Sequence, residues 1–178
     1  MLVVAATERE LAHVHGLETV VCGIGPVEAA LQTARALTAL KPDAVLHIGI
    51  AGARGIPAPA LVLGSESVYC DVVDPSSLLK RIERILPDPE LFARVQAALP
   101  EAHVLPIATA GKVGAGVECE VEAMEGFGVL RACALAGVPA VELRAVSNAP
   151  DEADRGTWSF EDAFVALGDA VARVVAAG

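Results

Sequence analysis

Short apolar segments alternate along this chain with segments of helical periodicity, and that alternation limits the possible folds more than any other feature. Residues 27–37 carry apolar side chains at helical spacing, and residues 160–174 repeat that pattern. Strands that alternate with helices indicate an α/β layered domain around a largely parallel sheet. The apolar runs that predict strands or extended chain are 2–6, 18–22, 44–50, 61–73, 103–109 and the run that follows Pro139 and ends at 144–148.

Glycine, proline and capping residues predict where these elements begin and end. Pro26 suits the first turn of a helix, and residues 51–59 are rich enough in glycine and proline to predict a loop. Ser159 and Asp162 are spaced as in a capping box at the start of the last helix. Neither an internal repeat nor a linker interrupts the sequence, so a single domain is expected over residues 1–178.

The composition limits the class of partner. The chain has 23 acidic and 13 basic residues and a formal net charge of −10, which disfavours nucleic acid and anionic membrane surfaces as partners. Although 54% of the residues are hydrophobic, no uninterrupted apolar run approaches the length of a transmembrane helix. We therefore expect a small-molecule partner, with no nucleic acid and no membrane.

The four cysteines give no sign of a metal or redox site. They form no Cys-x-x-Cys pair, and no histidine stands at zinc-ligand spacing from them. No metal and no organic cofactor are expected. The N-terminal residues 1–10 lack the basic region and cleavage pattern of a signal peptide, so a cytoplasmic protein is expected.

Two glycine-rich motifs follow apolar runs. Residues 23–25, Gly-Ile-Gly, resemble the start of a dinucleotide fingerprint, but Glu28 occupies its third small position, so a Rossmann site is not indicated. These glycines more simply allow a strand to turn tightly into a helix beside a ligand. Residues 47–52 lack the Gly-Lys-Ser/Thr of a Walker motif, and their glycines could be turn residues only. His47 is most simply a hydrogen-bonded core histidine.

Several polar residues have interpretations that need no function. Glu10 could be a surface charge at a helix start. Met124 could be a core methionine, and Glu125 a carboxylate at the N-terminus of the following helix. Asn148 could end a strand in a turn.

The segment 122–148 is the most informative part of the chain. Met-Glu-Gly at 124–126 opens an apolar helical run that ends at Gly-Val-Pro, 137–139, and a strand then leads to Arg-Ala-Val-Ser-Asn at 144–148. This order resembles the purine nucleoside phosphorylases and nucleosidases. The resemblance covers most of the chain and implies a three-layer αβα phosphorylase/hydrolase-like fold with a twisted, mixed central sheet.

The resemblance implies catalytic roles for two carboxylates. A glutamate at the position of Glu10 holds and activates the attacking water in similar nucleosidases. Glu125 is expected to accept hydrogen bonds from the ribose hydroxyls, with Met124 packed under the sugar. A buried carboxylate there would also stabilise the oxocarbenium-like charge of N-glycosidic cleavage.

The resemblance also implies a ribose-facing loop. It comprises Ile50, Ala51 and Gly52, with Gly25 beside the ligand, and Ile50 stands where many relatives have a serine that helps to bind phosphate or ribose. The missing hydroxyl and the lack of an evident arginine cluster favour water over phosphate as the nucleophile. Residues 78–120 are shorter than in typical relatives, and residues 113–117, which begin with Val113, are expected to contribute only backbone contacts to the base.

Asn148 is expected to select the base. Relatives that cleave 6-aminopurine nucleosides have aspartate there, whereas an amide can donate to a 6-oxo group and accept from a protonated N7. An unpaired buried donor or acceptor costs about 1–3 kcal/mol. Asn148 should therefore favour a hypoxanthine-like over an adenine-like leaving group by roughly tenfold or more.

The stretch 151–158, DEADRGTW, resembles an Asp-Arg-x-x-Trp stretch of futalosine hydrolases. Futalosine carries a carboxybenzoyl extension on its 5′ side, for which Arg155 and Trp158 would be fitting partners, with Arg54 and Lys112 as rival cations. Arg155 and Trp158 could equally be a surface ion-pair residue and a helix-packing residue. The expected reaction is hydrolysis of futalosine to hypoxanthine and dehypoxanthine futalosine, on the way to menaquinone.

Other functions remain open at this point. The chain could be a methylthioadenosine or adenosylhomocysteine nucleosidase, which Asn148 disfavours, or a phosphate-dependent phosphorylase, which Ile50 disfavours. It could also be a nucleoside-binding paralogue without turnover. The resemblance implies a homo-oligomer, a dimer or larger.

Overall fold

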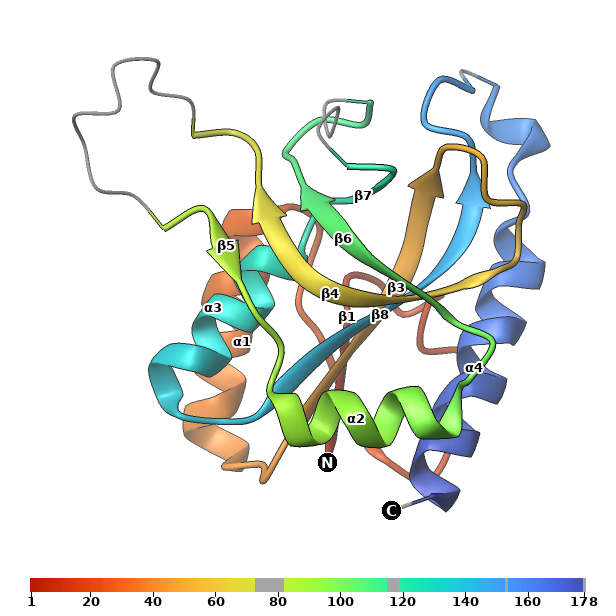
Figure 1. The fold of residues 1–178 in the computed structure, drawn as a ribbon. Coiled ribbons are helices and arrows are strands. Elements are labelled where there is room, and N and C mark those ends of the chain that lie inside the picture. The colour runs from red at the N-terminus through yellow and green to blue at the C-terminus, as the bar shows by residue number, and fades with distance from the viewer. Residues whose placement is uncertain (73–81, 115–118, 153, 178) are drawn as a thin grey trace.

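The computed structural model describes residues 1–72, 82–114, 119–152 and 154–177. Within these ranges an eight-stranded mixed sheet is covered by helices (Figure 1). The strands are β1 (Leu2–Ala5), β2 (Glu18–Val21), β3 (Val45–Ala53), β4 (Leu61–Tyr69), β5 (Arg84–Ile85), β6 (His103–Thr109), β7 (Val121–Ala123) and β8 (Ala140–Asn148). The helices are α1 (Pro26–Leu40), α2 (Pro89–Ala98), α3 (Gly126–Ala136), the 3-10 turn η1 (Arg155–Thr157) and α4 (Phe160–Ala176).

Part of the sheet closes on itself. The strand order β2-β1-β3-β7-β6-β4-β5 places β3 and β4 far apart, yet β8 pairs with both of them. Strands β3, β7, β6, β4 and β8 therefore form a ring. Its inner side is filled by small and branched apolar side chains from all five strands: Ala51, Ala53, Val62, Ile107, Val121, Ala123 and Val146.

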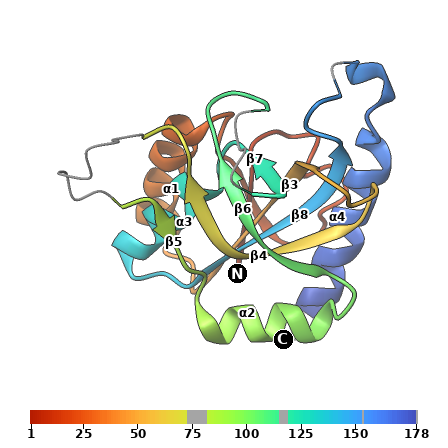
Figure 2. The ribbon, with the colours of Figure 1, turned by 45° about the horizontal axis from the view of Figure 1, so that its top comes forward.

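Helices cover both faces of the open part of the sheet. Helices α1 and α3 pack on one face, and α2 and α4 pack on the other (Figures 1 and 2). Within β1, Leu2 and Val4 contact the α1 and α3 layer, whereas Val3 and Ala5 contact the α2 and α4 layer. A strand that is buried on both faces reads as a continuous apolar run, as residues 2–6 do. The expected α/β layered architecture with a mixed sheet is confirmed.

The ends of the helices follow local chemistry. Pro26 occupies the first turn of α1, after Gly25 at a φ of 90°. Helix α3 ends at Gly137, whose φ of 68° lies in the left-handed region that glycine tolerates best. Helices α1 and α3 approach closely, since a Cβ on Gly128 would lie 2.4 Å from the carbonyl oxygen of Pro26.

Some details differ from the sequence expectations. Ala51 and Gly52 belong to β3 and not to a loop, because β7 pairs with this end of the strand through Gly52–Glu122 and Ala53–Val121. Ser159 precedes α4 but makes no side-chain capping bond, so the capping-box prediction is wrong. The predicted irregularity at Gly64 is confirmed by a register shift between β4 and β6.

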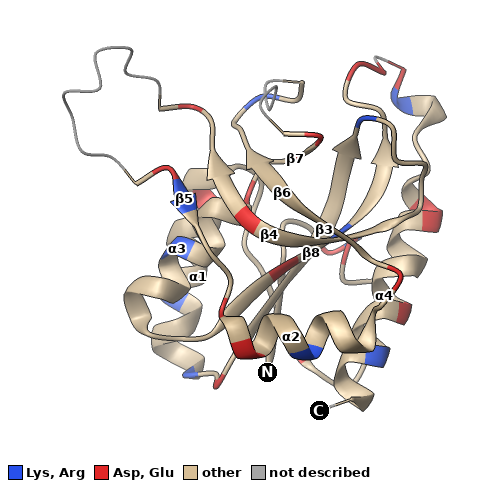
Figure 3. Cartoon of the chain, viewed as in Figure 1, with Lys and Arg blue, Asp and Glu red and all other residues tan. Residues whose placement is uncertain are grey.

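The predicted extended run 61–73 ends as a strand at Tyr69, and residue 73 lies outside the described residues. Among the described helices, none has the length and apolar character needed to cross a bilayer. In the view of Figure 3, the basic residues are dispersed over several elements and interspersed with acidic ones.

Candidate active site

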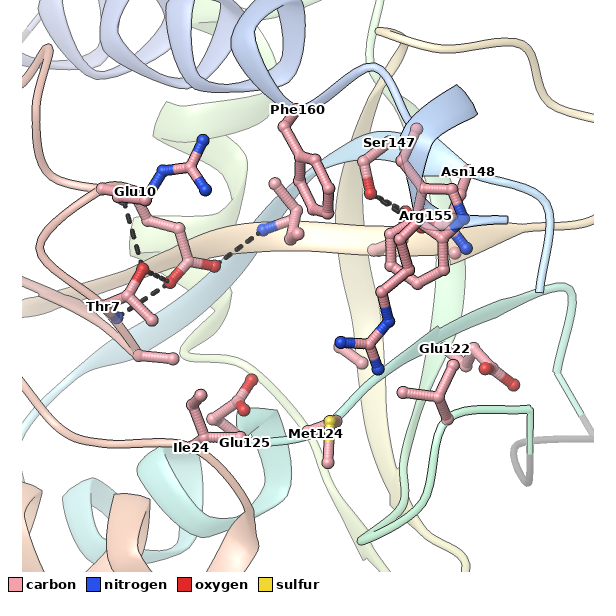
Figure 4. A pocket seen from close by; sticks show the side chains of 18 of the residues that line it. Thr7, Glu10, Ile24, Glu122, Met124, Glu125, Ser147, Asn148, Arg155 and Phe160 are labelled. Carbon is pink, nitrogen blue, oxygen red and sulfur yellow. Dashed lines mark hydrogen bonds between the residues drawn. The ribbon is translucent and has the colours of Figure 1, made fainter. Parts of the chain in front are cut away.

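A cavity of about 390 Å³ opens where β1, β3 and β8 end. The carboxyl ends of parallel strands are the usual place for a site in an α/β sheet. The start of α3 and the segment that leads into α4 complete its walls (Figure 4). The cavity is lined by Ala6, Thr7, Arg9, Glu10, Ile24, Ile50, Ala51, Gly52, Lys112, Val113, Glu122, Ala123, Met124, Glu125, Ser147, Asn148, Arg155, Trp158, Phe160 and Phe164.

The residues predicted from the sequence come together here. Of that set, only Gly25 is absent from the cavity wall, and its backbone N–H instead donates to Glu125 Oε1 at 3.1 Å. Of the two rival cations, Lys112 lines the cavity. Arg54 does not line it, but donates to the carbonyl of Cys119 at 2.8 Å and lies 3.7 Å from Glu122 Oε2.

Glu10 is held in place by hydrogen bonds from two segments. Its Oε2 accepts from the backbone N–H and the hydroxyl of Thr7, each at 2.9 Å, and its Oε1 accepts from the N–H of Ile50 at 3.0 Å. Only 5% of the residue is exposed, and it lies in a turn, not at the start of a helix. The interpretation as a surface charge is therefore wrong.

Glu125 lies at the N-cap of α3 and is also 5% exposed. Its Oε2 is 3.5 Å from Nη1 of Arg144. Burial raises the pKa of Glu125, and Arg144 and the N–H of Gly25 act in the opposite direction. Glu125 thus lies in the pocket as a buried carboxylate whose charge is only partly balanced.

Asn148 ends β8 and is partly buried. Its Oδ1 accepts from the hydroxyl of Ser147 at 2.8 Å, and its Nδ2 donates to the carbonyl of Ala149 at 2.9 Å. An amide has a second lone pair and a second N–H, which stay available to a ligand. Gly52 permits this placement, because a Cβ there would come within 3.2 Å of Nδ2.

Figure 4 shows how these groups are distributed around the cavity. Glu10 lies on one side and Asn148 lies on the opposite side, with Glu125 and Met124 along the wall between them. The cavity is thus faced from three directions by the carboxylates of Glu10 and Glu125 and the amide of Asn148.

Aromatic and cationic side chains form the wall near the start of α4. The guanidinium of Arg9 lies 5.7 Å from the ring centroid of Phe160 and 5.1 Å from that of Phe164. Arg155 lies 5.5 Å from the ring centroid of Trp158, whose Nε1 donates to the carbonyl of Glu152 at 3.2 Å.

Sequence reasoning missed part of this wall and its support. Phe160 and Phe164 belong to the helical stripe predicted over residues 160–174, and their spacing does not reveal that they line a cavity. Arg144 was recognised only as part of a motif, yet it is fully buried and contacts Glu125. The signal that could have identified it is a charged residue in the middle of an otherwise apolar strand.

The described residues contain no group of three or more His, Cys, Asp and Glu arranged to hold a metal ion. The polar groups that face the cavity are instead carboxylates, an amide and separate cations. Such an arrangement suits an uncharged polar ligand core, with a negative group near the arginines.

Comparison with known proteins finds relatives over most of the chain. The sequence profile of the phosphorylase superfamily matches residues 11–177. The futalosine hydrolase of Streptomyces coelicolor is 33% identical over 188 residues, which cover 89% of this chain and 78% of that protein.

Solved structures repeat the fold. A futalosine hydrolase mutant of Helicobacter pylori superposes with a TM-score of 0.86 at 19% identity, over 98% of this chain and 97% of the other. The 5′-methylthioadenosine/S-adenosylhomocysteine nucleosidase of Neisseria meningitidis superposes with a TM-score of 0.82 at 22% identity, over the same shares of the two chains.

Proposed function

The chain belongs to the phosphorylase superfamily, and on that premise we propose that it is a nucleosidase that hydrolyses futalosine to release hypoxanthine. The observation that carries the proposal is the convergence of Glu10, Glu125 and Asn148 on one cavity. The identity of 33% with a futalosine hydrolase over 89% of the chain supports the choice of substrate.

Glu125 is proposed to hold the ribose. A buried carboxylate can accept hydrogen bonds from two hydroxyl groups of a sugar, and Met124 beside it offers an apolar surface for the ring. Cleavage of an N-glycosidic bond develops positive charge on the sugar. The carboxylate of Glu125 would stabilise that charge more strongly than it stabilises the neutral substrate, which lowers the barrier.

Glu10 is proposed to position and activate water. Its Oε2 already accepts two hydrogen bonds from Thr7, whereas within the described part of the chain its Oε1 accepts only the N–H of Ile50. A carboxylate oxygen has two lone pairs, so Oε1 retains capacity for one water proton. Because the donors fix the carboxylate, the water would be held in a single orientation toward the sugar.

Water suits this end of the cavity better than phosphate does. Glu10 and Glu125 are both buried there, and Ile50 offers a side chain without a hydroxyl. A phosphate anion would be repelled by two nearby carboxylates. Arg144 lies 3.5 Å from Glu125 and does not line the cavity, so its charge is already shared with that carboxylate.

Asn148 is proposed to bind the departing base. The Ser147 hydroxyl and the Ala149 carbonyl hold the amide so that Oδ1 and Nδ2 each retain one free position. Oδ1 would accept from protonated N7 of hypoxanthine, and Nδ2 would donate to its 6-oxo group. The hydrogen bond to the 6-oxo group strengthens as the breaking glycosidic bond leaves its electrons on the base, and the hydrogen bond to N7 forms once N7 has taken up a proton.

The direct test is purine release from futalosine, inosine and methylthioadenosine, measured by chromatography with and without phosphate. We expect hypoxanthine from futalosine in phosphate-free buffer. Glu10→Gln should lower kcat by roughly a hundredfold or more, because it removes the base that activates water. Strict dependence on phosphate, release of adenine in preference to hypoxanthine, or full activity of Glu10→Gln would each contradict the proposal.

Asn148→Asp should reverse the base preference. Aspartate can donate to N7 only when protonated, and its other oxygen accepts, which suits a 6-amino group and leaves a 6-oxo group without a donor. We expect the ratio of kcat/KM for futalosine to that for methylthioadenosine to fall at least about tenfold. Asn148→Ala is the matched control, since it should lower both values without inverting the preference. An unchanged ratio in Asn148→Asp would remove Asn148 from base selection.

The wall near α4 is proposed to bind the 5′ extension. Arg9 and Arg155 both line the cavity and continue into a neighbouring shallow pocket, together with Trp158 and Phe160. The aromatic rings could pack against an aryl group, and a guanidinium could bind its carboxylate through two N–H groups. No other part of the described cavity wall combines two cations with aromatic rings.

Arg155→Leu should raise KM for futalosine by roughly tenfold, as expected for a lost charge-assisted hydrogen bond. The same variant should leave inosine, which has no 5′ carboxylate, nearly unaffected. Arg94→Leu removes an exposed arginine from α2, away from the cavity, and serves as the control. If Arg155→Leu changed KM equally for both nucleosides, the role in 5′ recognition would be wrong.

We also propose that the protein is a homo-oligomer that assembles through α1. Ile24, Val27 and Leu31 are 64%, 68% and 63% exposed, and Ile24 also lines the cavity. Apolar side chains that cluster beside a site are a common sign of an interface. A second copy placed on them would cover the cavity rim at Ile24.

Light scattering after size exclusion should give a mass of at least two 18.2 kDa chains. Val27→Glu should reduce that mass, because it places a charge in the buried interface. An unmutated protein that stays monomeric at micromolar concentration would contradict the assembly.

A further inference from the structure

Arg144 is fully buried and does not line the cavity itself, but it contacts Glu125 and Ile50, which do. Its Nε donates to Glu142 Oε1 at 2.8 Å, and its Nη2 lies 2.7 Å from His47 Nε2. Its Nη1 faces the carbonyl of Ile50 at 3.4 Å and Glu125 Oε2 at 3.5 Å. Two sides of the guanidinium are therefore held by buried groups, and the third side faces the proposed catalytic residues.

His47 holds Arg144 as a neutral acceptor. Its Nδ1 lies 3.0 Å from the carbonyl oxygen of Val4, which can only accept, so the ring proton is on Nδ1. Nε2 is then free to accept from Arg144. Burial and the neighbouring guanidinium lower the pKa of His47 well below its ordinary value, which keeps the ring neutral.

Glu142 holds Arg144 from the other side. It is fully buried, and its second oxygen, Oε2, accepts from the hydroxyl of Ser67 at 2.8 Å. The Ser67 hydroxyl lies 3.3 Å from that of Thr109, which in turn accepts from the N–H of Phe127 at 2.9 Å. This chain of bonds connects Arg144 to β4, β6 and the start of α3.

Two glycines leave the space that this arrangement needs. A Cβ on Gly49 would lie 2.2 Å from Arg144 Nη1 and 2.7 Å from Glu10 Oε1. A Cβ on Gly126 would lie 2.1 Å from Glu142 Oε2. The guanidinium and the water-binding oxygen of Glu10 therefore occupy the same small space above Gly49.

The buried positive and negative charges around Arg144 are unequal in number. Its single guanidinium interacts electrostatically with three buried carboxylates, those of Glu10, Glu125 and Glu142. Glu142 is in direct contact with Arg144 and so takes up much of its charge, leaving less for the two carboxylates that face the cavity. None of His47, Glu142 and Arg144 lines the cavity, so His47 and Glu142 can act on the reaction only through Arg144 and the carboxylates beside it.

We propose that His47 and Glu142 are positioning residues that fix the Arg144 guanidinium beneath Glu125 and Glu10 and set how much of its charge those two carboxylates receive. The effect on catalysis rests on the proposed function. The effect of Glu142 on the charge of Glu125 can be measured without a substrate. The chemistry assigned to the cavity needs Glu125 ionised when the sugar becomes positive, so the charge left on Arg144 sets the pH at which the site becomes active.

The test is Glu142→Gln, which keeps the shape of the side chain and removes its charge. The amide oxygen can accept from Arg144 Nε, and the amide N–H can donate to Ser67, so every buried partner stays bonded. The groups that face Glu125 are Arg144 and Glu142 of β8, Glu10 of the turn after β1, and Cys22 after β2, a thiol whose pKa burial raises to about 12. Glu142→Gln removes one repulsion and frees Arg144, and both changes lower the pKa of Glu125.

Carbon-13 NMR of labelled glutamate carboxyl groups, assigned with Glu125→Gln, measures this directly. We expect Glu125 to titrate at lower pH in Glu142→Gln than in the unmutated protein. The acid limb of the kcat/KM profile for futalosine should move in the same direction. Glu101→Gln removes the same charge from an exposed pair with Arg173 and should move neither.

An unmoved titration of Glu125 in Glu142→Gln would overturn the proposal, whatever happens to the rate. If the unmutated protein releases no purine from any nucleoside, the proposed function fails, and the NMR titration still decides the electrostatic inference.

His47 is tested by a pair of variants. His47→Leu leaves Nη2 of Arg144 without an acceptor and should lower kcat by roughly ten- to a hundredfold, with little change in KM because His47 does not touch the cavity. His47→Gln keeps an acceptor and should recover most of the lost rate. Equal rates in folded His47→Leu and unmutated protein would contradict the role of His47.

Discussion

The buried guanidinium of Arg144 is the group on which the rest of the site depends. A charge in a protein interior is tolerated only when it is paired and hydrogen-bonded, and here two carboxylates, a neutral histidine and a backbone carbonyl surround it. That requirement explains two glycines, at 49 and 126, which leave space for the ionic groups. It also explains why β3 and β8 must pair in one register, since that register places Gly49 opposite Arg144.

The ring of strands encloses the ionic groups around Arg144 next to the cavity. Strand β8 pairs with β3 on one edge and with β4 on the other, so polar groups on its inner side are enclosed by neighbouring strands. Along β8 the buried pair Glu142 and Arg144 gives way to Val146 and then to Asn148 at the open end. One strand thus supplies the buried support of the proposed ribose site and the group proposed to bind the base. Burying these charged groups costs free energy, but the buried carboxylate of Glu125 can then stabilise the positive charge that develops on the sugar.

Several of the strands, helix α3 and most of the cavity residues could be predicted from the sequence, for a physical reason in each case. The buried strands appear as apolar runs, and α3 is delimited by Met124-Glu125 before it and Gly137 after it. Strand β7 has only three residues and pairs antiparallel with β3, which is distant in sequence, and parallel with β6. No periodicity in the sequence therefore predicts the ring of strands or the extension of β3 past Ile50. Glu10 was open to a surface interpretation because its burial depends on Thr7 and on Ile50, which is 40 residues away. Phe160 and Phe164 have the spacing of a core-facing stripe, which does not distinguish a core from a cavity wall.

Central to the proposed function is that water attacks the sugar at a site organised by Arg144. The most direct measurement is mass spectrometry of the sugar product after rapid turnover of futalosine in ¹⁸O-labelled water that also contains phosphate. A parallel sample of preformed product corrects for exchange of its anomeric oxygen. We expect a free sugar that carries one ¹⁸O atom at its anomeric carbon. A sugar 1-phosphate without the label would contradict it.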